Sequence, residues 1–166
     1  MESTWNQLRH LFERDDGSLP EIELTGLGGA ALPDAFASIW RRGRDATAGG
    51  ASYFDQGEGR DRPIASAEDA AHAAALVHRG DAESVHVVVG DLAAGGSSLP
   101  DLGVFVHPDG LTLDFRMGPA WGPPQVDALF TLLLRVAESA PDMEVRVPAA
   151  GGAFDRAWEQ FRDARR

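Results

Sequence analysis

Two short apolar stretches joined by a tight turn constrain the fold of this chain more than any other feature. Residues 102–106 and 111–115 have the composition of strands, and the sequence His-Pro-Asp-Gly separates them at residues 107–110. Proline, aspartate and glycine in this order favour a type I turn in which the glycine takes the left-handed conformation. The expected cross-strand pairs are Val104 with Leu113 and Val106 with Leu111 on the buried face, and Phe105 with Thr112 on the outer face. Such a hairpin requires antiparallel pairing.

Other predicted strands and helices are interspersed along the rest of the chain. The strands are expected at residues 21–25, 51–54, 85–89 and 143–147, and the helices at residues 4–14, 33–40, 66–79, 123–139 and 154–165. Thr4 is a candidate N-cap of the first helix, and Ser66 with Asp69 resembles a capping box. No internal repeat or domain boundary is found. We therefore predict that residues 1–166 form one α+β domain, mainly an antiparallel sheet of about five or six strands with helices packed chiefly on one face.

The chain is strongly acidic, and this limits its possible partners. Its 166 residues include 26 Asp and Glu against 15 basic residues, for a formal net charge of −11. Such a surface repels phosphate backbones and anionic lipid, so we expect neither nucleic-acid nor membrane binding. It favours a basic protein partner, because opposite charge steers encounter and raises the association rate. The alternative is that the acidity serves solubility alone.

Several absences narrow the chemistry and the cellular setting. There is no cysteine, which excludes disulfides, thiol nucleophiles and zinc sites built on thiolates. Every basic residue is an arginine, which together with abundant alanine, glycine and aspartate indicates a GC-rich, bacterial-type genome. The N-terminus lacks the pattern of a secretory signal, and no apolar run approaches the roughly 18 residues of a membrane span. We predict a cytoplasmic protein.

The residues most often used in catalysis form no recognisable signature here. The five histidines are His10, His72, His78, His86 and His107, and none belongs to a metal-binding or catalytic motif. His86 lies in the valine-rich strand and can project toward Asp114, which would form an acid/base pair. The alternative is a histidine that is simply hydrogen-bonded within the sheet. No serine nucleophile elbow, phosphate loop, cofactor motif or metal site is predicted.

Two glutamates of the strand at residues 21–25 share its polar face. Glu21 and Glu23 alternate with the apolar Ile22 and Leu24. As paired carboxylates they can bind a cation. The more common role of exposed glutamates on an edge strand is to prevent edge-to-edge pairing with another chain.

Two loops carry the candidate contact residues for a partner. Three prolines and two glycines shape the segment at residues 114–124, which presents Arg116, Met117 and Trp121. The alternative for Trp121 is a core plug that holds the start of the following helix. The second loop begins after Tyr53 and is expected to be polar and mobile. Its candidate residues are Tyr53, Asp55, Glu58 and Asp61.

Two functions of different classes follow from these observations. The first is a small acidic binding protein that neutralises a basic protein partner, as immunity proteins do for toxins. The chain resembles such proteins in size and charge only, and no motif ties it to one family. In this case the acidic loops steer the partner, and Trp121, Arg116 and Tyr53 anchor it. The second is a small enzyme or ligand-binding domain with a pocket between sheet and long helix, lined by His86, Asp114 and Arg116.

Overall fold

A six-stranded antiparallel sheet forms the centre of the fold in the computed structural model, which describes residues 3–165. The strand order is β10-β1-β9-β8-β5-β2. The strands are β1 (Glu21–Thr25), β2 (Arg44–Asp45), β5 (Val85–Gly90), β8 (Leu102–His107), β9 (Gly110–Phe115) and β10 (Glu144–Arg146). The predicted fold class, a single α+β domain with a mainly antiparallel sheet, is confirmed.

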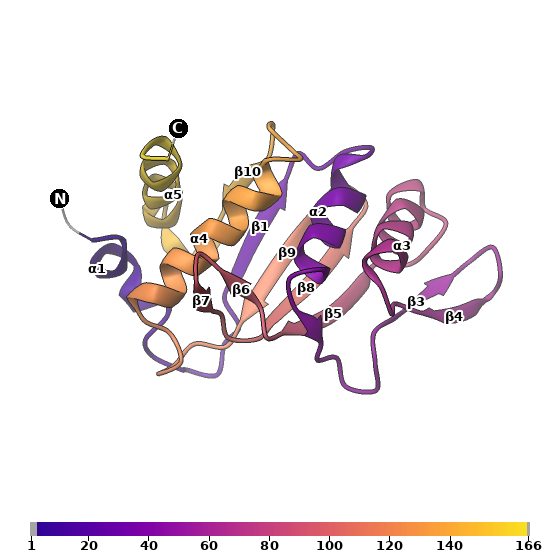
Figure 1. The fold of residues 1–166 in the computed structure, drawn as a ribbon, viewed down its shortest axis with the longest axis horizontal. Helices are drawn as coiled ribbons and strands as arrows, with labels where there is room; N and C mark the ends of the chain where they lie inside the picture. Colours follow the sequence, from indigo (N-terminus) through magenta and orange to yellow (C-terminus); the bar gives the residue numbers. More distant parts are fainter. Residues whose placement is uncertain (1–2, 166) are drawn as a thin grey trace.

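Three helices cover one face of this sheet, as Figure 1 shows. They are α2 (Ala31–Trp40), α3 (Ala67–Arg79) and α4 (Pro123–Ala137). At the end of the molecule where both chain termini lie are α1 (Thr4–Leu8), which continues as the 3-10 helix η1 (Arg9–Leu11), and α5 (Ala153–Asp163), preceded by η2 (Pro148–Ala150). Two small hairpins complete the fold: β3 (Ser52–Asp55) with β4 (Arg60–Pro63), and β6 (Ala93–Ala94) with β7 (Ser97–Ser98) beside α4.

The hairpin of β8 and β9 has the predicted register but a different turn. Val104 pairs with Leu113, Val106 with Leu111, and Phe105 with Thr112, as expected. Gly110, however, does not take a left-handed conformation, since its φ is not positive, and it is instead the first residue of β9. The glycine is needed for a close approach, because a Cβ at residue 110 would lie 2.4 Å from the Leu24 carbonyl oxygen of β1.

Alternation of side chains along each strand separates the core from the opposite face. Most apolar residues of the long strands point toward the helices and are buried, for example Ile22, Leu24, Val87 and Val104, whereas Val88 and Phe105 lie half-buried on the opposite face. Each such aliphatic side chain stabilises the fold by about 1.5–3 kcal/mol when fully removed from water. Phe130 of α4 extends this core to the end of the sheet, where three aromatic rings of α5 meet it edge-on.

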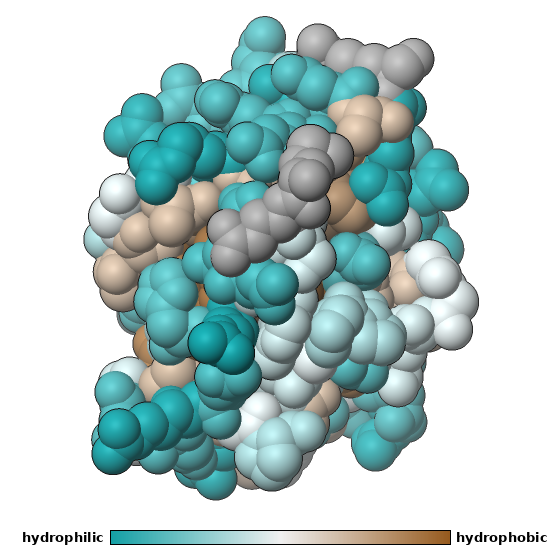
Figure 2. Space-filling view, turned by 90° about the vertical axis from the view of Figure 1, so that its left-hand side faces the viewer, coloured by the Kyte–Doolittle hydropathy of each residue, from teal (hydrophilic) through white to brown (hydrophobic). Residues whose placement is uncertain are grey.

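The helix termini follow ordinary capping chemistry. The predicted capping box of α3 is present, and Gly80 ends that helix in the left-handed conformation. At α1 the prediction was wrong by one residue: Ser3, not Thr4, is the N-cap, and its hydroxyl accepts a hydrogen bond from the Asn6 N–H. Figure 2 looks onto the end of the molecule formed by α1 and α5, where hydrophilic side chains predominate and apolar ones emerge in patches between them.

Candidate functional site

The sheet face opposite α2, α3 and α4, here called the open face, carries the strongest concentration of chemically versatile side chains. Alternation places the remaining residues of each strand there, and these are exposed or half-buried except at glycines. Six of them line a cavity of about 330 Å³, which we call the hollow. They are Glu21 and Glu23 of β1, Thr112 and Asp114 of β9, and Phe105 and His107 of β8.

Two of the three carboxylates in the hollow have no cationic partner. Among residues 3–165, Glu21 and Glu23 form no ion pair. The Cα partner of Glu23 on β10 is Arg146, but its Nη2 lies 2.7 Å from Oε2 of Glu144. The hollow therefore presents a local excess of negative charge on a rigid sheet.

The position of β1 rules out the edge-guard role for these glutamates. β1 pairs with β10 on one side and with β9 on the other, so it is an interior strand. Charges that protect a sheet from edge-to-edge association belong on edge strands. Protection of a sheet edge therefore does not explain Glu21 and Glu23. What the structure shows is that they lie across from Asp114 and Thr112 on the adjacent strand.

His86 and Asp114 form the pair that the sequence suggested. His86 Nε2 donates to Asp114 Oδ2 at 2.9 Å, with 43% and 20% of the two side chains exposed. The residues lie on β5 and β9, and β8 runs between them. Gly103 of β8 makes the contact possible, because a Cβ at that position would lie only 2.3 Å and 2.4 Å from the two carboxylate oxygens of Asp114.

A row of three aromatic rings crosses the open face beside this pair. The Phe105 ring lies between His86 and His107, with centroid distances of 5.3 Å and 4.8 Å. The ring of His107 is stacked on that of Phe105, and its Nε2 is hydrogen-bonded to Thr112 Oγ1 at 3.0 Å. These contacts hold the apolar wall of the hollow in one arrangement.

The loop between β9 and α4 does not present its tryptophan to solvent. Trp121 is 5% exposed, packs against Phe12 and Phe115, and donates its indole N–H to the Arg116 carbonyl at 2.8 Å. Of the two roles considered for Trp121, the core plug is the one that the structure has. Met117 is also buried. As they lie, neither side chain is accessible to a partner.

The pocket expected between the sheet and the long helix is not where His86 and Asp114 meet. Both side chains lie on the open face, whereas α4 packs on the other. Arg116 does not join them: its side chain is 81% exposed, and its Nε lies 4.0 Å from Asp15 Oδ2. The structure therefore brings together two of the three residues of that predicted lining.

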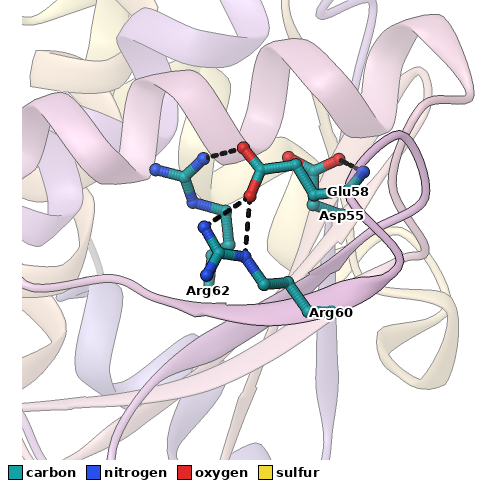
Figure 3. Close-up of polar contacts among 4 residues, drawn as sticks. All are labelled: Asp55, Glu58, Arg60 and Arg62. Atoms are coloured by element: carbon teal, nitrogen blue, oxygen red, sulfur yellow. Dashed lines mark hydrogen bonds and ion pairs between the residues drawn. The ribbon is translucent and has the colours of Figure 1, made fainter.

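The segment at residues 52–63, here called the arm, is a hairpin rather than an irregular loop. Tyr53 and Asp55 of β3 are buried, and burial raises the pKa of the Tyr53 phenol. Glu58 at the turn is held by Arg60 and Arg62 through ion pairs of 2.7 Å and 2.5 Å, as Figure 3 shows.

These ion pairs reduce the negative charge with which the arm could attract a basic partner. Both arginines pair with one carboxylate, Glu58, and Asp55 accepts a hydrogen bond from the backbone N–H of Glu58 at 3.0 Å. Only Asp61 among the predicted steering residues of the arm is exposed without an ion partner in the described part of the chain. The open face, not the arm, carries the more concentrated unpaired charge.

Searches for metals, membrane spans and relatives add no assignment. No group of three or more ligating side chains within residues 3–165 can hold a metal ion. None of the helices in that range is long and apolar enough to span a bilayer. No protein-family model, curated protein or solved structure significantly matches the chain.

Proposed function

We propose that this chain is a small acidic binding protein that docks a basic segment of a protein partner on its open face. An immunity-type protein that neutralises a basic toxin is one example of this class. The observation that carries the proposal is the pair of glutamates in the hollow, Glu21 and Glu23, which form no ion pair among residues 3–165 and are not edge guards.

Charge and rigidity support this function together. The net charge of −11 attracts a basic partner from a distance, and the hollow supplies a local target for its cations. The glutamates stand on an interior strand that is hydrogen-bonded on both sides, so their backbone needs little ordering when the partner binds.

The test first identifies the natural partner and then compares its binding to matched variants. The tagged protein is used to capture partners from its native lysate at low salt, and the material released at high salt is identified by mass spectrometry. Association of the purified partner is then measured for wild type, for Glu21→Gln/Glu23→Gln, and for Asp61→Asn/Glu83→Gln. The last variant removes the same charge from exposed sites outside the hollow.

The two double variants separate a site from a general charge effect. We expect the hollow variant to slow association and speed dissociation, and the control variant to retain most of the wild-type affinity. Equal losses in both would reduce the role of the protein to non-specific attraction. Unchanged binding in the hollow variant would place the interface elsewhere.

The hydrogen bond between His86 and Asp114 favours a second candidate, a small enzyme or ligand-binding domain on the same face. A carboxylate that accepts from a histidine ring orients the ring for acid/base chemistry. His86→Ala distinguishes the two. A protein-binding face tolerates the change, whereas a catalytic or ligand-binding site loses turnover or small-molecule affinity with little dependence on salt.

A further inference from the structure

The hollow combines carboxylate acceptors with an aromatic wall. We propose that it receives an arginine side chain of the basic partner in preference to a lysine. This inference rests on the proposed function and names the group that the open face recognises. Three properties of the hollow lead to it: the spread of its acceptors, the rings beside them, and the lack of a competing internal cation.

The acceptors come from two adjacent strands. Glu21 is the cross-strand partner of Asp114, and Glu23 is the partner of Thr112. Side chains directly opposite on antiparallel strands start about 4.5–5.5 Å apart at their Cβ atoms. The carboxylates therefore surround the hollow instead of meeting at one point. A guanidinium distributes five N–H donors around a plane and can serve several such acceptors, whereas an ammonium concentrates three donors at one atom.

The aromatic wall discriminates further between the two cations. The half-buried Phe105 ring and the His107 ring stacked on it remove part of the water that a cation would otherwise keep. A guanidinium is more weakly hydrated than an ammonium and packs readily against aromatic side chains. Lysine thus gives up more hydration on entering the same hollow.

Within residues 3–165, no cationic side chain lines the hollow or pairs with its two glutamates. Arg146 is across from Glu23 in the sheet but is held by Glu144. His86 engages one oxygen of Asp114, Oδ2, and approaches from the β5 side, outside the residues that line the hollow. An incoming guanidinium therefore displaces no internal ion pair of Glu21 or Glu23.

The experiment compares two synthetic peptides that differ only in the type of cation. Both have the same length and the same glycine-serine background, one with four arginines and the other with four lysines. Each is titrated into the full-length ¹⁵N-labelled protein at low salt. We expect the arginine peptide to bind roughly fivefold more tightly, the scale of one cation–aromatic contact, with the largest amide shifts in β1, β8 and β9.

Variants assign the preference to the hollow. Phe105→Leu keeps every carboxylate but removes the central ring, so it should bring the two peptide affinities close together. Glu23→Gln should weaken both peptides, and Asp61→Asn on the arm should weaken neither by a comparable factor. The amide spectra of each variant without peptide establish that its fold is intact.

The possible results distinguish this inference from the proposed function. Equal affinities for the two peptides, both reduced by Glu23→Gln, would overturn the arginine preference and leave an acidic docking face in place. A preference for arginine that survives Phe105→Leu would also overturn it as argued here. Absence of shifts in β1, β8 and β9 with either peptide would overturn both proposals.

Discussion

At the scale of single residues, Gly103 determines the chemistry of the open face although it has no side chain. The Asp114 carboxylate occupies the space in which a Cβ at residue 103 would lie and so reaches His86 across an intervening strand. Gly103→Ala should rotate that carboxylate away and break the contact. Because the displaced group is the free end of a half-buried side chain that can rotate, we expect a cost of only about 1 kcal/mol.

The Gly103→Ala prediction is measured by two independent quantities. The ring ¹⁵N signals of His86 should shift toward those of an Asp114→Asn variant, while urea unfolding shows a small change. Gly28→Ala is the matched control, since a Cβ there has no neighbour within 4 Å. Unaltered His86 signals in Gly103→Ala would contradict the role assigned to this glycine.

The local sequence pattern was sufficient to predict the positions of some site residues but not of others. Alternation along β5 and β9 placed His86 and Asp114 on one face, and both strands pair with β8, which lies between them. The role of Trp121 was undecidable from the sequence, because a proline- and glycine-rich loop can equally present or bury a tryptophan. The residue that decides it is Phe12, which is more than 100 positions away in the chain.

At the scale of elements, sequence separation set the limit of prediction. The β8–β9 hairpin was predictable because the strands are joined by a two-residue turn. The neighbours of β1 were not, because β9 and β10 follow it by roughly 90 and 120 residues and no local signal selects them. The misassignment of Glu21 and Glu23 as edge guards came from that missing information. Likewise, the arm appeared irregular until β4 was found paired with β3.

The capping box of α3 gives an element whose stability depends on pH. The backbone N–H groups of Ala65 and Ser66 each donate to Asp69 Oδ2 at 3.0 Å. The hydrogen bond from Ala65, followed by that of the Ser66 side chain, lowers the pKa of Asp69 from its model-compound value of 3.8. A lowered pKa in the folded state means that the charged carboxylate stabilises folding above pH 3.8 and that this stability is lost as the pH falls through the folded-state value.

Asp69→Asn should therefore destabilise the protein near neutral pH by about 0.5–1 kcal/mol, and progressively less as the solution is acidified below pH 3.8. The measurement is urea unfolding of wild type and variant across that range. Glu68→Gln is the control, because it removes a charge from the same helical turn without those two hydrogen bonds. A difference between wild type and Asp69→Asn that stays constant on acidification would refute the linkage.

At the scale of the whole molecule, acidic side chains outnumber basic ones, 26 to 15. Six carboxylates in the described residues 3–165 pair with arginines and a seventh, Asp114, is hydrogen-bonded to His86, while the full chain has 26 acidic side chains. The exposed pairs contribute little each. Unpaired carboxylates on one small domain disfavour the compact state, since folding brings them closer together. The net charge could be predicted from the composition alone. That three of the carboxylates line one hollow could be recognised only once the strand order was known.

Self-repulsion of this kind predicts that salt stabilises the fold. Raising KCl from about 10 mM to about 500 mM should increase Tm by a few degrees, with most of the gain below about 0.2 M, where the Debye length falls to roughly 7–10 Å. MgCl₂ at equal ionic strength should give the same Tm if screening alone is responsible. A larger increase with Mg²⁺ that disappears in Glu21→Gln/Glu23→Gln would instead indicate cation binding in the hollow. A Tm that falls with KCl would mean that attractive pairs outweigh repulsion, contrary to the charge distribution described above.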